Sequence, residues 1–160
     1  MKIFVSHALT DIDLINRLDS TLKPCGIKLL IAEHYVSMTD TITAKIEKMI
    51  DSSDAALILL TQNGFNSHFV QQEIGYIKKA KKPSLKVVEK GFEDKITGFI
   101  YGHDYIGYDP SAPEEAIKRI TSRLLAFYKK IQQEKVLNQK ILIGLGLFAG
   151  ALFLMDDGDE

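Results

Sequence analysis

Apolar residues along the chain occur either in short continuous runs or in stripes with helical spacing. The runs predict strands over residues 3–5, 27–31, 55–60, 85–88 and 105–108. The stripes predict helices over residues 11–22, 40–50, 68–82 and 113–131. Because strands that alternate with helices connect through right-handed crossovers, the pattern predicts an α/β fold with a doubly wound, five-stranded parallel sheet.

The run 55–60 has no polar residue on either face, which is typical of a central parallel strand covered by helices on both sides. In such sheets, ligands bind beyond the carboxyl ends of the strands, where the following loops converge. Three loops meet this condition, at residues 6–10, 34–39 and 61–67. None carries the glycine pattern of a dinucleotide-binding turn or of a P-loop, so the sequence supports neither kind of phosphate site.

The C-terminal region differs in character from the rest of the chain. Residues 141–155 carry no charge, and the apolar segment 136–155 is about 20 residues long, which is enough for one membrane-spanning helix. Lysines precede this segment and acids follow it. The positive-inside rule therefore predicts a cytoplasmic domain, residues 1–132, anchored to the inner or plasma membrane by a single-pass helix.

An alternative for residues 133–160 is a hydrophobic helix that completes a core or an oligomer interface. Gly146 and Gly150 form a GxxxG spacing, which lets two apolar helices approach closely and favours self-association. The residues leave both interpretations open.

Composition narrows the possible functions. The chain has 160 residues and a formal net charge of −1, which fits one globular domain and gives no basic field for nucleic acid. The single cysteine, Cys25, excludes an internal disulfide and a cysteine-based zinc site, and it suits a reducing compartment. The four histidines are scattered without metal-binding spacing, so no metal site is expected.

Three residues of the third predicted helix share one face. Phe69, Glu73 and Tyr76 follow one another at intervals of four and three residues, which places a carboxylate between two aromatic rings. Such a face is also typical of ordinary packing against a neighbouring helix. Spacing alone therefore does not identify an active site.

Five segments resemble conserved boxes of the Toll/interleukin-1 receptor (TIR) domain family, especially its prokaryotic branch. They are Phe4–Asp11, Cys25–Ile27, Asp40–Ile42, Ser53–Thr61 and Asn66–Glu73, and Pro83 matches the family's usual lysine-proline break. The resemblance covers roughly residues 1–130. The order and spacing of these segments together are more specific than any single box. The resemblance implies a flavodoxin-like, five-stranded parallel sheet, followed here by the C-terminal apolar helix.

Two features depart from the family pattern. Phe69 stands where a tryptophan is more usual, and the loop 35–39 lacks the familiar Pro-Gly turn.

The function that this resemblance implies is cleavage of NAD+ at the nicotinamide–ribose bond, to ADP-ribose or a cyclic isomer. Glu73 is then the catalytic residue, and NAD+ is the substrate, with no further cofactor. The residues implied to contact the substrate are Ser6, His7, Ala8, Tyr35, Asp40, Ser67 and Phe69. The resemblance also implies an effector or signal producer in immune or anti-phage defence that is activated when TIR domains self-associate.

Two other functions stay open at this point. The first is a non-catalytic TIR adaptor or scaffold that docks other TIR domains. The second is a nucleoside-handling enzyme of the same sheet type, which shares the ribose chemistry but does not act on NAD+. Loss of activity on replacing Glu73 distinguishes an enzyme from a scaffold.

Overall fold

The computed structural model describes residues 1–32, 40–96 and 105–156, and for residues 40–42, 135, 138 and 140–156 it describes the backbone alone. The strands are β1 Lys2–Ser6, β2 Lys28–Ile31, β3 Ala55–Leu60, β4 Ser84–Glu89 and β5 Tyr105–Tyr108. The α-helices are α1 Ile12–Leu22, α2 Asp40–Ser52, α3 Gln62–Asn66, α4 His68–Lys79 and α5 Pro113–Asp156. Short 3-10 turns lie at Leu9–Asp11, Lys23–Cys25 and Glu93–Lys95.

The strands form one five-stranded sheet with the order β2-β1-β3-β4-β5, and every neighbouring pair is parallel. The predicted α/β class and doubly wound parallel sheet are therefore confirmed. β3 lies at the centre, and all six of its residues are buried, as its continuous apolar run predicts. The register aligns Ser6, the last residue of β1, with Ile58 of β3.

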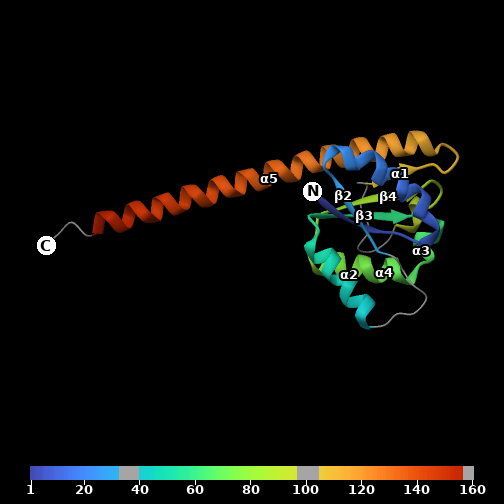
Figure 1. Cartoon of the computed structure of the whole chain (residues 1–160), viewed down its shortest axis with the longest axis horizontal. Coiled ribbons are helices and arrows are strands. Elements are labelled where there is room, and N and C mark those ends of the chain that lie inside the picture. Colours follow the sequence, from blue (N-terminus) through green and yellow to red (C-terminus); the bar gives the residue numbers. More distant parts are fainter. Residues whose placement is uncertain (33–39, 97–104, 157–160) are drawn as a thin grey trace. The chain divides into compact units, whose positions relative to one another are not determined.

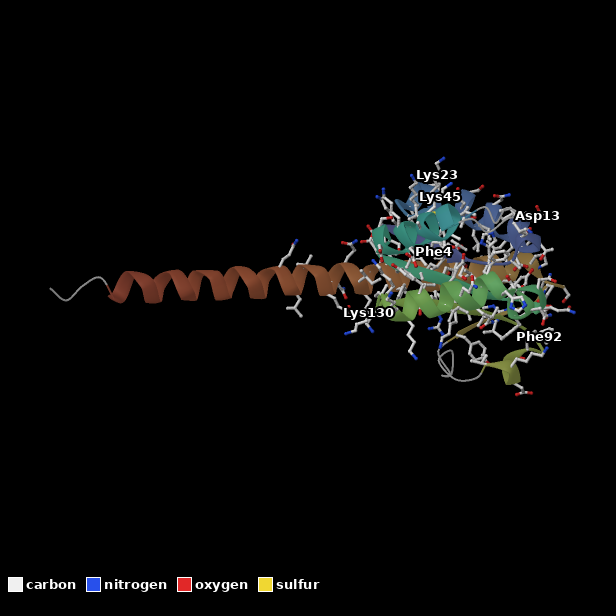
Figure 2. All side chains as sticks on the ribbon, turned by 90° about the horizontal axis from the view of Figure 1, so that it is seen from below. Phe4, Asp13, Lys23, Lys45, Phe92 and Lys130 are labelled. Carbon is white, nitrogen blue, oxygen red and sulfur yellow. The ribbon has the colours of Figure 1, made fainter. Side chains whose placement is uncertain are left out.

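Helices cover both faces of the sheet (Figure 1). α2 and α4 lie on one face, where Phe4 and Ile58 pack in a core cluster with Val70 and Ile74 of α4. α1 and the first turns of α5 lie on the opposite face, toward which the alternate strand residues point. Figure 2 shows Phe4 within the domain, while Asp13 and Lys23 lie at its surface.

The loop predicted at 61–67 is wrong for most of its length, because residues Gln62–Asn66 form the short helix α3. Thr61 caps this helix: its Oγ1 accepts a hydrogen bond of 2.9 Å from the Gly64 N–H. Position 64 favours glycine for a steric reason, since a Cβ built there would lie 2.4 Å from the Leu59 carbonyl oxygen. The chain therefore turns directly from the central strand into a capped helical turn.

The helix predicted over residues 113–131 is longer than expected, because α5 runs without a break from Pro113 to Asp156 and includes the apolar segment. The chain divides into two compact units, Met1–Leu124 and Leu125–Glu160. Among the residues that the structure describes, no helix is both long enough and apolar enough to span a membrane. The side chains of 140–156, on which the predicted anchor depends, lie outside the described residues.

Candidate functional site

A buried hydrogen bond joins the end of β1 to α4. The Ser6 hydroxyl donates to Glu73 Oε2 at 2.6 Å, between residues 67 positions apart in the sequence. The exposed fraction is 0% for Ser6 and 3% for Glu73. A distance of 2.6 Å is short for an O–H···O hydrogen bond, so the serine holds the carboxyl group in one orientation.

Burial changes the protonation of this carboxyl group. Removal from water disfavours the charged form and raises the pKa of Glu73 to about 8, although the Ser6 hydrogen bond opposes the shift. The desolvation effect is larger than the hydrogen-bond effect. At neutral pH the carboxyl group of Glu73 is therefore mostly protonated in the empty site.

Glu73 lies at a pocket of about 290 Å³ between α2 and α4. The described residues that line it are Thr43, Ile46, Glu47, Phe69, Gln72, Glu73 and Tyr76. The helix face predicted from the spacing of Phe69, Glu73 and Tyr76 is thus confirmed as one side of a cavity. A mostly apolar pocket with a few polar groups is typical of a small-molecule site.

Local structure at the start of α4 positions this face. Ser67 has an extended backbone and is the N-cap of the helix, where its Oγ accepts a hydrogen bond of 3.3 Å from the Val70 N–H. The cap sets where the helix begins and so sets the rotation of Phe69 and Glu73 toward α2. The structure shows a capping role for the Ser67 hydroxyl, and the predicted contact of Ser67 with substrate stays a prediction.

His7 and Ala8 follow Ser6 but turn into the protein. His7 Nδ1 lies 3.2 Å from the Val5 carbonyl oxygen, to which it donates, and burial lowers the pKa of the imidazole. The Ala8 N–H donates to Asp11 Oδ2 at 3.3 Å. Neither His7 nor Ala8 is among the described residues that line the pocket.

Two other predicted contacts are not placed by the structure. Tyr35 lies outside the described residues. Asp40 begins α2, as predicted, but its side chain lies outside the described part of the chain. Their predicted contacts with substrate stay predictions.

Sequence reasoning missed four residues of the pocket: Thr43, Ile46, Glu47 and Gln72. Ile46 belongs to the apolar stripe that predicts the helix over residues 40–50. The helical period from Phe69 predicts Gln72 on the same face as Glu73, so that residue was detectable. The α2 residues were not, because only the tertiary structure brings α2 against α4.

A second polar cluster lies on the other side of the β1 carboxyl end. Asp11 Oδ2 accepts hydrogen bonds from Thr61 Oγ1 at 2.9 Å and from the Ala8 N–H. Thr61 in turn caps α3 through Gly64. The predicted helix over residues 11–22 is confirmed to within one residue, since α1 begins at Ile12 after a 3-10 turn and has Asp11 as its N-cap.

The sequence between residues 3 and 121 matches the family model described as "TIR domain". The chain belongs to the TIR domain family. The match covers both the Ser6–Glu73 pair and the polar cluster around Asp11, and it confirms the resemblance found in the sequence motifs. No curated protein matches the chain in sequence.

Solved structures of low sequence identity share the fold of this TIR domain. The RPS4 and RRS1 TIR domain heterodimer matches with a TM-score of 0.57 at 9% identity, over 79% of this chain and 97% of that one. A prokaryotic SEFIR domain matches with a TM-score of 0.53 at 12% identity, over 76% and 96%. The CMP N-glycosidase BcmB of Clostridium botulinum matches with a TM-score of 0.52 at 12% identity, over 75% and 98%.

Proposed function

We propose that this TIR domain is an NAD+ nucleosidase that cleaves the nicotinamide–ribose bond and releases ADP-ribose or a cyclic isomer of it. The observation that carries the proposal is the position of Glu73. Its carboxyl group is almost fully buried, is oriented by Ser6, and lies at a pocket that two aromatic side chains also line. Perturbed carboxyl groups in such pockets are typical of catalytic sites.

The chemistry suits a single carboxylate. The nicotinamide ring of NAD+ carries a positive charge and leaves as a neutral molecule, so its departure needs no general acid, unlike ordinary glycoside hydrolysis. Positive charge then develops on the ribose. Glu73 in its ionised form stabilises that charge, and the stabilisation is greatest in the transition state.

Ionisation of Glu73 is coupled to binding in this mechanism. The empty site holds a mostly neutral carboxyl group, since its pKa is raised to about 8. A cationic ring placed against it favours the carboxylate and lowers that pKa. The proton of Glu73 passes to solvent as substrate binds, and the resulting carboxylate lies next to the ribose on which positive charge develops.

A protonated Glu73 favours a second candidate, cleavage of a nucleoside or nucleotide with an uncharged base. Such a leaving group needs a proton, and a carboxyl group with a pKa of about 8 can supply it at neutral pH. The CMP N-glycosidase has the same fold. The two reactions differ in pH dependence: kcat/KM rises with pH through about 8 for NAD+ and falls over the same range for an uncharged base.

The proposal includes self-association, a membrane tether over residues 136–155 and a role in immune or anti-phage defence. Tethering in a membrane plane raises the local concentration of TIR domains. Extraction of the full chain from membranes tests the tether: it requires detergent for the full chain and none for residues 1–135. Equal extraction of both without detergent would contradict the tether.

The decisive experiment is NAD+ consumption by the purified chain at concentrations that permit assembly, with products identified by mass. Glu73→Gln keeps the size of the side chain and removes its charge, so turnover falls by about 10³-fold. Asp11→Asn is the matched control, because it changes a partly buried acid outside the pocket and leaves turnover within about threefold.

Two outcomes would contradict this function. Turnover retained in Glu73→Gln would remove the role of Glu73. An absence of turnover in the wild-type chain across pH 6 to 9, with NAD+ and with uncharged nucleotides, would favour a non-catalytic TIR adaptor.

A further inference from the structure

The pocket at Glu73 contains a second carboxylate. Glu47 projects from α2, is partly buried and lines the same cavity of about 290 Å³. A cavity of that volume is about 8 Å across if it is spherical, so a small ring inside it lies close to both acids. None of the described residues that line the pocket is a lysine or an arginine.

The acidic character extends to the edge of the pocket. Asp51 follows Glu47 by four residues on α2 and therefore lies on the same face of that helix. Its carboxylate accepts a hydrogen bond of 3.3 Å from the Tyr76 hydroxyl. Burial and the charges of Asp51 and Glu47 raise the pKa of the Tyr76 phenol.

Lysines also lie near this edge. Lys79 Nζ is 5.5 Å from the centre of the Tyr76 ring, and Lys82 Nζ donates to the Asp51 backbone carbonyl at 2.7 Å, but neither lysine lines the pocket. Within the cavity, the described charged or titratable side chains are therefore Glu47, Glu73 and Tyr76.

This arrangement discriminates between the two ends of a dinucleotide. The Glu47 carboxylate repels a pyrophosphate, as does Glu73 in its ionised form, and no lysine or arginine among the described lining residues offsets that repulsion. Phe69 and Tyr76 present aromatic rings, whose faces attract a flat cation. The pocket thus favours a small aromatic ring that carries a positive charge.

We infer that Glu47 is a specificity-determining residue that selects a cationic pyridinium ring over an uncharged base. This inference rests on the proposed function, since it assigns the nicotinamide end of NAD+ to the pocket at Glu73. Glu47 acts on the bound ring through its charge and takes no part in bond cleavage. At an effective dielectric constant of about 20, a carboxylate several ångströms from the ring changes affinity by about tenfold or more.

Binding of two ring probes to the full chain tests Glu47 directly. The probes are 1-methylnicotinamide, which is a cation, and nicotinamide, which has the same ring without the charge, and neither has a ribose bond to cleave. The wild-type chain binds the cation more tightly than the neutral ring at pH 7. Glu47→Gln weakens binding of the cation by about tenfold and leaves binding of nicotinamide within about twofold.

Two further variants act as controls. Glu134→Gln makes the same substitution at an exposed position of α5, and it leaves both affinities unchanged. Glu47→Asp keeps the charge on a shorter side chain, so it retains a measurable preference for the cation if Glu47→Gln folds poorly. An unchanged preference in Glu47→Gln, or an equal loss of both probes, would overturn the inference.

NAD+ kinetics separate failure of this inference from failure of the proposed function. Glu47→Gln raises KM for NAD+ by about tenfold and does not lower kcat by more than about threefold, because Glu47 acts on the charge of the bound ring and takes no part in bond cleavage. If the wild-type chain cleaves no NAD+ but prefers the cationic probe through Glu47, the proposed function fails and the selectivity stands. If NAD+ is cleaved through Glu73 and Glu47→Gln changes neither KM nor the probe preference, the inference alone fails.

Discussion

Two carboxylates near the carboxyl end of β1, Glu73 and Asp11, have different surroundings. Burial raises the pKa of both groups. Asp11 joins a closed network in which the Ala8 N–H and the Thr61 hydroxyl donate to it. Glu73 is held by Ser6 and lies at a cavity. A buried acid that ties loops together stabilises the fold, whereas a buried acid at a cavity is available for chemistry.

The largest expected effect concerns the cost of burying Glu73. Its pKa is about 8 in the folded chain against an ordinary value of 4.5, so between these values the folded state holds a proton that the unfolded state has released. The stability that neutral Glu73 contributes is fully present below pH 4.5 and is lost as the pH rises through 8.

Glu73→Gln cannot ionise, so its stability relative to wild type increases by up to ~1.4 kcal/mol for each pH unit between 4.5 and 8. Urea unfolding of both chains at pH 5, 7 and 9 measures this difference. A difference independent of pH would mean that Glu73 ionises normally in the folded chain.

Gly64→Ala tests the hydrogen-bond network of Asp11, which Thr61 extends to the Gly64 N–H. The new Cβ would lie 2.4 Å from the Leu59 carbonyl oxygen, which is backbone of the central strand, so one of the two segments must move. We expect a loss of about 3 kcal/mol in the free energy of unfolding, measured by urea denaturation. Gly75→Ala is the control, because a Cβ there meets nothing within 4 Å. Equal stability of the two variants would contradict the close approach at Gly64.

Asp11→Ala has a smaller effect on the same network. It removes the acceptor for the Thr61 hydroxyl and the Ala8 N–H, which costs about 1–3 kcal/mol in the free energy of unfolding. Turnover per folded molecule stays within about threefold, since Asp11 lies outside the described lining of the pocket. A loss of turnover as large as that of Glu73→Gln would contradict the assignment of Asp11 to stability and Glu73 to catalysis.

Ser6→Ala has the smallest expected effect and tests positioning of the carboxyl group. The Ser6 hydrogen bond lowers the pKa of Glu73, so its loss moves the midpoint of the kcat/KM profile for NAD+ to higher pH. Turnover at pH 7 falls by about tenfold. Ser53→Ala is the control, because this buried serine donates to the Ile50 carbonyl and does not contact Glu73. An unshifted profile would contradict the positioning role of Ser6.

Most of the fold was predictable from local pattern. The residues of β5 were identified directly, and so was β3, whose continuous apolar run reports burial on both faces of the sheet. α3 was missed because Gln62–Asn66 has no apolar stripe and forms through the Thr61 cap. The hydrogen bond between Thr61 and Asp11 could not be predicted, because the two residues lie 50 positions apart in the sequence.

The sequence by itself determined the five strands, the four longer helices between and after them, and the shared face of Phe69, Glu73 and Tyr76. These features depend on periods of two and 3.6 residues, which are local properties of the chain. The tertiary structure decided that Ser6 meets Glu73 and that Glu47 lies at the same pocket. Both depend on how α2 and α4 pack on β1, since the register of a parallel sheet and the contacts between helices join residues far apart in the sequence.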